Sequence, residues 1–304
     1  MNEQPPIRGI IPPIITPFTH TGEVDFDAFA HNCERWNSEP LGGLLVLGSN
    51  SEAPYLNEEE KLTLIRLAVR SSPPGRIVLA GTGLESTRET IRLTNLAASL
   101  GAHAALVLTP FYYGEMMSEA AVIRHYTAIA EASDIPILLY NVPRFTHYNI
   151  PAGAVAELSR HPGITGMKDS SGNLGQLKEF ISSAAPGFTV IPGSASLLPA
   201  AAESGVETAI IAIANAFPGI CARILNRPSE SASLHSSLMS VSRVASDRHG
   251  IPGLKYLCTL AGYEGGYPRS PLQPLGEDAE AGIRAALDAS GLLQHASNPS
   301  GQEA

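Results

Sequence analysis

The run Ile164-Thr165-Gly166-Met167-Lys168-Asp169 decides the fold of this 304-residue chain and points to its chemistry. A short apolar segment that ends in a lysine is typical of a buried strand whose last side chain lies where water is scarce. Desolvation disfavours the ammonium form of a lysine and favours the free amine, which can attack a carbonyl group. Lys168 is therefore a candidate nucleophile. The structural alternative is a packed stem whose head is solvated or paired with Asp169.

Seven other short apolar runs share this character, and helical patterns separate them along the chain. The runs are almost continuously hydrophobic rather than alternating, as expected of parallel strands that are covered on both faces. The eight predicted strands are Gly9–Thr16, Gly42–Leu47, Arg76–Gly81, Ala104–Thr109, Ile135–Tyr140, Ile164–Lys168, Phe188–Pro192 and Thr208–Ala214.

The segments between these runs carry helix signals. Asn57 precedes three glutamates, which is an N-cap followed by acidic residues in the first turn, and Ser86-Thr87-Arg88-Glu89 is a capping-box pattern. A third helix is expected after Ser118, where apolar residues recur at helical spacing. Eight strand–helix alternations over about 225 residues predict a (β/α)8 TIM barrel. The alternative is a doubly wound open sheet, but no Gly-rich dinucleotide-binding turn follows the first run.

Beyond the barrel, the pattern changes to helices with no strands between them. Predicted helices cover Ser229–Arg248, Pro252–Ala261 and Glu277–Ser290, and glycines and prolines separate the last two. We therefore expect a barrel with the active site over residues 1–225 and a small helical C-terminal region over residues 226–293. The polar tail over residues 294–304 is expected to be disordered.

Composition excludes several kinds of partner. The net charge is −9, which gives no support to binding of nucleic acid or of an anionic membrane. The three cysteines are far apart and lack metal-site spacing, which favours reduced thiols. The N-terminus has neither the apolar core of a signal peptide nor an Arg-rich transit pattern, and no apolar stretch is long enough to cross a bilayer. These features predict a cytoplasmic protein.

The carboxyl ends of the predicted strands meet at one rim of the barrel, where such barrels carry their active sites. Hydroxyl groups, phenols and one lysine gather there. The segments are Gly48-Ser49-Asn50-Ser51-Glu52, Thr109-Pro110-Phe111-Tyr112-Tyr113, Tyr140-Asn141-Val142-Pro143, Lys168, Pro192-Gly193-Ser194 and Asn215. No cluster of His, Cys, Asp and Glu among them has the spacing of a metal site, so neither a metal nor a cofactor is predicted.

The chain resembles the dihydrodipicolinate synthase / N-acetylneuraminate lyase family of class I aldolases in three motifs: Gly48-Ser-Asn-Ser-Glu52, Tyr140-Asn-Val-Pro143 and Gly166-Met-Lys-Asp-Ser170. The resemblance covers nearly the whole chain. It implies that Lys168 forms a Schiff base with pyruvate or another 2-oxo acid, and that the protonated imine acts as an electron sink. It also implies that Tyr140 moves protons to and from the imine carbon and the substrate hydroxyl.

The same resemblance implies further roles. Ser49 and Tyr112 would relay protons, with Tyr112 reaching in from a neighbouring subunit of a homotetramer built as a dimer of dimers. The backbone at Gly193 would approach the lysine, and Ile210 would form a wall of the site.

Binding of the substrate carboxylate is expected at Ser49 and Asn50, because the backbone N–H groups of the Gly48–Ser51 turn can form an anion-binding nest. Each site residue also has a structural interpretation. Tyr112 and Tyr140 would be strand-end aromatics whose hydroxyls reach water, and the Ser-Asn-Ser run would be only a turn. The joint pattern favours the functional interpretation.

One departure from the family concerns the second substrate. Dihydrodipicolinate synthases carry an arginine two residues after the proline of the Tyr-Asn-Val-Pro motif, and its planar fork grips the carboxylate of aspartate semialdehyde. That position is Phe145 here, and Arg144 lies one residue earlier. This departure disfavours the synthase within the family.

Three further segments, Ala80–Thr87, Gly250–Lys255 and Gly262–Leu272, look more like 4-hydroxy-2-oxoglutarate aldolases. The leading hypothesis is therefore retro-aldol cleavage of a 4-hydroxy-2-oxo acid to pyruvate and an aldehyde such as glyoxylate. The alternatives are a 2-keto-3-deoxy sugar-acid aldolase and dihydrodipicolinate synthase itself. A catalytically silent barrel that binds a metabolite is the non-enzyme alternative, because fold alone does not establish activity.

Overall fold

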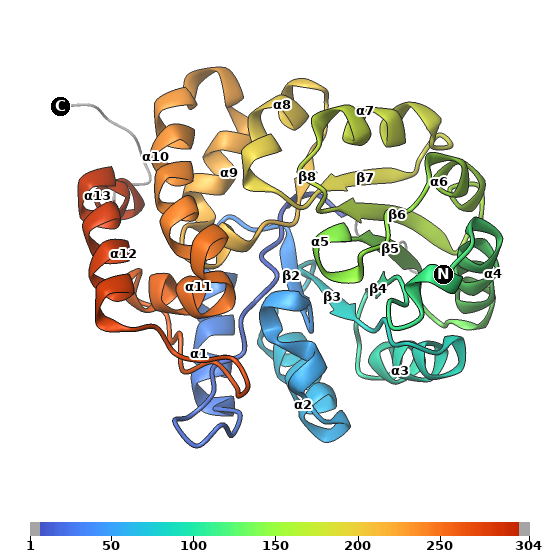
Figure 1. Ribbon diagram of the computed structural model, residues 1–304, viewed down its shortest axis with the longest axis horizontal. Helices are drawn as coiled ribbons and strands as arrows, with labels where there is room; N and C mark the ends of the chain where they lie inside the picture. Colours follow the sequence, from blue (N-terminus) through green and yellow to red (C-terminus); the bar gives the residue numbers. More distant parts are fainter. Residues whose placement is uncertain (1–6, 298–304) are drawn as a thin grey trace.

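Eight parallel strands close into a barrel in the computed structural model, which describes residues 7–297 (Figure 1). Six strands pair in sequence order, and the first pairs with the eighth. The strands are β1 (Gly9–Ile10), β2 (Gly43–Val46), β3 (Ile77–Gly81), β4 (Ala104–Leu108), β5 (Ile137–Asn141), β6 (Ile164–Asp169), β7 (Thr189–Pro192) and β8 (Thr208–Ala209). The N–H of Leu45 donates to the carbonyl of Pro12 (3.0 Å) and that of Ile210 to Pro192 (3.1 Å), which joins the two sheets. The predicted (β/α)8 barrel is confirmed.

Helices cover the outside of the barrel and begin where the sequence places their caps. Their bounds are α1 (Phe26–Asn37), α2 (Glu58–Ser71), α3 (Thr87–Ser99), α4 (Glu119–Ala132), α5 (Pro143–Thr146), α6 (Ala152–Leu158), α7 (Leu174–Ser183), α8 (Leu198–Glu203) and α9 (Pro218–Asn226). At α2, the side chain of Asn57 accepts from the N–H of Glu60, whose carboxylate accepts from the N–H of Asn57. Ser86 and Ser118 cap α3 and α4, and caps of this kind contribute about 1 kcal/mol each.

Two predicted strands are wrong in length. The first, Gly9–Thr16, ends at Ile10, because the following prolines have no N–H to donate to a ladder. The eighth, Thr208–Ala214, ends at Ala209, and Ala212–Asn215 forms a 3₁₀ turn instead. The side chain of Asn215 then links the two irregular segments, since it accepts from the N–H of Ile15 (3.1 Å) and donates to the carbonyl of Pro13 (3.0 Å).

Alternate residues of neighbouring strands fill the barrel interior with apolar side chains, and burial contributes about 1.5–3 kcal/mol for each side chain of leucine size. This interior cluster includes Leu45, Leu79, Leu106, Leu138, Tyr140, Ile191 and Ile210. Tyr140 is the inward-facing residue nearest the carboxyl end of β5, so the cluster ends where the predicted site begins.

The C-terminal helices gather on one side of the barrel, next to α9 and α1 (Figure 1, orange to red). They are α10 (Ala232–Ser242), α11 (Arg248–Leu260), α12 (Glu277–Ser290) and α13 (Leu292–Ser297). A π-helical turn, Arg243–Asp247, joins α10 to α11, and Gly250 (φ 61°) kinks α11 near its start. The two helices predicted over Ser229–Arg248 and Pro252–Ala261 therefore form one kinked rod. Their apolar residues share a core cluster with the barrel.

The prediction of a disordered tail is wrong for residues 294–297, which belong to α13. Gly291 adopts a left-handed conformation (φ 68°) that ends α12, and the next residue, Leu292, is fully buried and anchors the following turn. The rest of that predicted tail lies outside the described residues. Within residues 7–297, no helix combines the length and apolar character that a membrane crossing requires.

Candidate active site

Lys168 and Tyr140 are direct neighbours across the β5–β6 pair, which places both side chains at one point of the rim. Both are largely buried, with 5% and 6% of their surfaces exposed. The Lys168 Nζ lies 4.6 Å from the centroid of the Tyr140 ring. The Tyr140 hydroxyl is 3.4 Å from the Oγ of Ser49, so these three predicted residues meet as a nucleophile with a two-hydroxyl chain beside it.

A cavity of about 440 Å³ opens over these residues. Its barrel side includes Ser49, Asn50, Tyr140, Lys168, Ser170 and Gly193. A cavity of this size suits a small metabolite. A larger cavity of about 540 Å³ lies at the opposite end of the barrel, where the strands begin, and contains none of the predicted site residues. We assign the substrate site to the smaller cavity because it contains the candidate nucleophile.

The turn that follows β2 presents Ser49 and Asn50 to this cavity. Residues Ser49–Ser51 form a single 3₁₀ turn, closed by a hydrogen bond from the N–H of Ser51 to the carbonyl of Gly48 (3.0 Å). Two non-glycine residues in the left-handed conformation, Leu47 (φ 61°) and Glu52 (φ 55°), flank the turn.

A buried polar network fixes the ends of β5 and β6. The side chain of Asn141 donates to Asp169 (2.8 Å), whose other carboxylate oxygen accepts from the hydroxyl of Ser171 (2.7 Å). Asp169 is fully buried, these amide and hydroxyl donors occupy its carboxylate, and within residues 7–297 no ion pair joins it to Lys168. The alternative interpretation of Lys168 as a partner of Asp169 is wrong.

Gly193 approaches the lysine as predicted. A Cβ atom at this position would lie 3.0 Å from the Cε of Lys168 and 2.0 Å from the Oγ of Ser170. A side chain at residue 193 would therefore displace both groups. Ser170 lines the cavity and was not singled out as a site residue from the sequence.

Two predicted residues lie away from the cavity of this chain. Tyr112 is 74% exposed and packs edge-on against Tyr113, with 5.0 Å between the ring centroids. Its backbone N–H donates to the carboxylate of Glu85 (3.0 Å). This hydrogen bond fixes the backbone of the loop but does not fix the phenol ring of Tyr112. Ile210 is fully buried in the interior cluster with Tyr140, and Ala212 and Ile213 line the cavity in its place.

The outer wall of the cavity comes from α5 and from the kinked C-terminal rod. Arg144 and Phe145 come from α5, and Ser242, Ser246, Asp247 and His249 come from the kinked segment that joins α10 to α11. Burial raises the pKa of Asp247, and the positive charge of Arg144 counteracts this shift. These C-terminal residues were missed because their segment was expected only to cover the barrel. The Gly-Ile-Pro-Gly motif at Gly250 was the available signal, since it marks the kink.

No group of three or more His, Cys, Asp or Glu side chains gathers in metal-ligating geometry within residues 7–297. The cavity lining instead supplies the amine of Lys168, several hydroxyl groups, the guanidinium group of Arg144 and the side chains of Asp247 and His249.

Comparison with known proteins agrees with this geometry. The model of the dihydrodipicolinate synthetase family matches residues 6–290. The chain belongs to this family. A 4-hydroxy-tetrahydrodipicolinate synthase of Exiguobacterium sp. strain AT1b is 31% identical over 286 residues, which cover 92% of this chain and 97% of the relative.

Solved structures extend the family comparison to two activities. The 2-keto-3-deoxygluconate (KDG) aldolase of Sulfolobus, in complex with D-KDPG, matches with a TM-score of 0.84 and 25% identity, covering 92% of this chain and 95% of its own. A monomeric dihydrodipicolinate synthase variant matches with a TM-score of 0.88 and 26% identity, covering 96% and 99%. The protein is a pyruvate-dependent class I aldolase or lyase of the dihydrodipicolinate synthetase family. These relatives do not support the closer resemblance to 4-hydroxy-2-oxoglutarate aldolases.

Proposed function

We propose that Lys168 is the amine that forms the Schiff base with pyruvate. Attack of the neutral Nζ on the ketone carbon gives a carbinolamine, and loss of water gives the protonated imine. Loss of a proton from the adjacent methyl group then gives an enamine, whose carbon attacks an aldehyde to form a carbon–carbon bond. Retro-aldol cleavage is the reverse sequence. The observation that carries the proposal is a buried lysine amine facing the cavity beside Tyr140 and Ser49.

Tyr140 is proposed to move the protons that these steps require. Its ring lies 4.6 Å from the Nζ of Lys168 and its hydroxyl lies 3.4 Å from the Oγ of Ser49, so a proton released at the imine has two hydroxyl groups close by to accept it. Ser49 and Asn50 are proposed to bind the carboxylate of pyruvate, since both line the cavity at the start of a 3₁₀ turn, where backbone N–H groups can bind an anion.

For the second substrate, the first candidate is aspartate semialdehyde, which gives 4-hydroxy-tetrahydrodipicolinate synthase activity. The name of the relative from Exiguobacterium supports this choice. The family arginine is replaced by Phe145, yet the guanidinium of Arg144 lies on the cavity wall one residue earlier. A guanidinium is therefore available there for the carboxylate of this substrate.

Retro-aldol cleavage of a 4-hydroxy-2-oxo acid is the second candidate. The observation that favours it is Phe145, an apolar and half-exposed ring where the synthases carry a carboxylate-binding arginine. The KDG aldolase neighbour also keeps a 2-keto-3-deoxy sugar acid among the candidate substrates.

Borohydride trapping followed by a substrate panel tests this proposal. Reduction in the presence of pyruvate should add one reduced pyruvate to Lys168, located by peptide mass spectrometry. The untreated protein is then assayed for three activities: condensation of pyruvate with aspartate semialdehyde, cleavage of 4-hydroxy-2-oxoglutarate, and cleavage of KDG. Condensation faster than either cleavage supports the first candidate. Absence of any adduct would leave only a silent metabolite-binding barrel.

A homotetramer is proposed as the assembly, with Tyr112 of one subunit completing the proton relay of its neighbour. The exposed ring of Tyr112 is free to enter a second copy, which supports this proposal. Sedimentation should give a dimer or tetramer, and Tyr112→Phe should then slow turnover. An active monomer would remove the role of Tyr112, and a monomeric relative makes this outcome a real alternative.

A further inference from the structure

The turn that carries Ser49 and Asn50 ends at a buried charge that the proposed mechanism does not use. Glu52 is 1% exposed and does not line the cavity. Its Oε1 forms an ion pair with the Nζ of Lys255 in α11 (2.6 Å), and its Oε2 accepts from the N–H of Arg269 (2.8 Å). Both partners come from the C-terminal region, far from Glu52 in the sequence.

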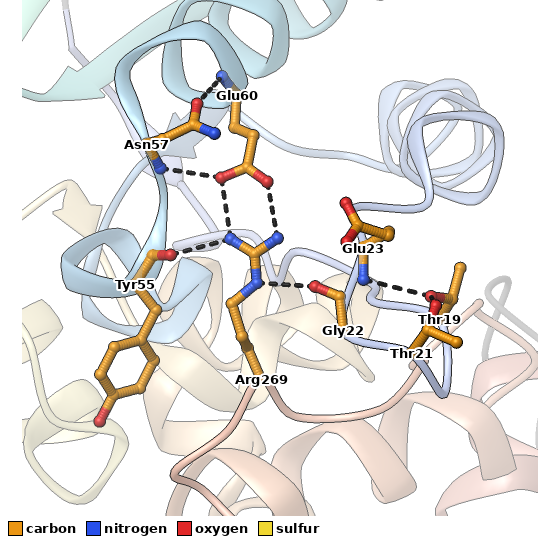
Figure 2. A network of polar contacts seen from close by, with 8 residues as sticks. All are labelled: Thr19, Thr21, Gly22, Glu23, Tyr55, Asn57, Glu60 and Arg269. Carbon is orange, nitrogen blue, oxygen red and sulfur yellow. Dashed lines mark hydrogen bonds and ion pairs between the residues drawn. The ribbon is translucent and has the colours of Figure 1, made fainter.

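The two cationic residues are themselves tied to several segments. The Nζ of Lys255 also donates to the carbonyl of Tyr267 (2.6 Å). The guanidinium of Arg269 forms two hydrogen bonds with the carboxylate of Glu60 (2.8 and 2.6 Å). Figure 2 shows Arg269 between Glu60, Tyr55 and Gly22, with its donors directed at all three. The segment after the Ser49–Ser51 turn is therefore held from the C-terminal side at two points.

This arrangement fixes a backbone conformation that Glu52 does not adopt readily. A non-glycine residue in the left-handed region costs energy and persists only when its surroundings over-determine it. The N–H of Glu52 donates to the carbonyl of Ser49 (3.1 Å), and the N–H of Tyr55 donates to that of Glu52 (2.8 Å). The orientation of Glu52 therefore sets the end of the 3₁₀ turn.

Stability alone is a weak explanation for the pair. Removing a carboxylate and an ammonium group from water costs about as much as their attraction returns, so buried pairs are poor stabilisers. Such a pair can select one arrangement of the chain over others, because an arrangement that separates the partners leaves a buried charge unpaired.

We propose that Glu52 and Lys255 are positioning residues that hold the Ser49–Asn50 turn in the geometry that binds the substrate carboxylate. This inference rests on the proposed function, since it assigns that turn to the carboxylate. The same helix supplies Leu254 to the cavity lining, so α11 both lines the site and holds the end of this turn through Lys255.

The test measures the pyruvate concentration that gives half-maximal borohydride trapping, together with the trapping rate at saturating pyruvate. Glu52→Gln and the double variant Glu52→Gln/Lys255→Met are compared with the wild type. The double variant leaves neither Glu52 nor Lys255 as an unpaired buried charge, so we expect it to fold. Glu58→Gln is the matched control, because Glu58 forms an exposed ion pair with Arg92 and does not line the cavity.

We expect both variants to need roughly tenfold more pyruvate for half-maximal trapping, with the saturating rate within about threefold of wild type, which is the pattern of lost binding. The control should match the wild type. A folded double variant with wild-type half-saturation would overturn the proposal, and so would a double variant that no longer folds, since the pair would then serve stability. Failure of the wild type to trap pyruvate would overturn the proposed function as well.

Discussion

Two buried lysines of this protein have opposite surroundings. Lys168 faces the cavity, and within residues 7–297 no carboxylate lies at ion-pair distance from its amine. Lys255 is equally buried, but the carboxylate of Glu52 lies 2.6 Å from its Nζ. Burial lowers the pKa of Lys255 to about 8, and the negative charge of Glu52 opposes that shift. Burial alone therefore does not make a lysine a nucleophile. The nucleophile needs an open cavity and the absence of an acidic partner.

The largest expected effect separates the two lysines by their chemistry. Lys168→Ala should abolish the covalent pyruvate adduct and reduce turnover to background, because no other amine faces the cavity among the described residues. Peptide mass spectrometry after borohydride reduction measures the adduct. Lys178→Ala, at an exposed position on α7, is the control and should trap normally. If the Lys168→Ala variant still forms an adduct at another lysine, the assignment of Lys168 as the nucleophile is wrong.

The second prediction concerns the stability role of the paired lysine. Lys255→Met should lower the free energy of unfolding by about 3–5 kcal/mol, because it leaves the carboxylate of Glu52 buried without its cationic partner. Urea denaturation measures this change. Adding Glu52→Gln removes the unpaired charge and should restore most of the loss. If Lys255→Met is as stable as the wild type, the carboxylate of Glu52 is not left as an unpaired buried charge in that variant.

The sequence predicts the cavity floor better than its outer wall, and the two lysines show why. Lys168 ends an apolar run, and parallel strands must place their carboxyl ends at one rim, so Ser49, Tyr140 and Gly193 follow from local patterns. The pairing of Lys255 with Glu52 depends on contacts between segments that are distant in the sequence. The hydrogen bond from Arg269 to the same glutamate, for example, spans 217 positions. No local pattern encodes such a contact.

The same limit explains the other differences. The first strand is shorter than predicted because hydrophobic periodicity does not register that Pro12 and Pro13 lack an N–H. Asp247 and His249 reach the cavity only because the π-helical turn and the kink at Gly250 redirect the rod. The role of Tyr112 depends on a second chain, so neither the sequence nor a single chain tests it.

The third prediction tests whether the amine works without its neighbouring phenol. Tyr140→Phe should still form some trapped imine, because Lys168 keeps its buried position. Turnover with the second substrate should fall by about 100-fold, since a proton-transfer group typically contributes 10²–10⁴-fold. Steady-state kinetics and adduct trapping measure the two steps separately. Tyr55→Phe, outside the cavity, is the control, and equal activity of both variants would exclude the relay.

The smallest expected effect extends the comparison to a third buried base, His125. Its Nδ1 lies 2.9 Å from the hydroxyl of Thr87, while its Nε2 is buried without a hydrogen-bond partner in the described structure. Burial lowers the pKa of His125 from 6.5 to about 4, so the folded protein holds this ring neutral. Like Lys168, it has no carboxylate at ion-pair distance within residues 7–297, but it does not line the cavity of the candidate site.

This shift predicts a pH dependence with a definite sign. Between pH 6.5 and 4, His125 binds a proton in the unfolded chain but not in the folded protein. The contribution of the neutral ring to the free energy of unfolding is therefore complete above pH 6.5 and is lost as the pH falls through this window. For this residue the loss between pH 8 and pH 5 is about 2 kcal/mol. The measurement is the free energy of unfolding of wild type and His125→Gln at both values. Other groups titrate in the same range, so the difference between the two proteins isolates His125. Equal losses in both would mean that the imidazole is protonated, and therefore hydrated or paired, in the folded state.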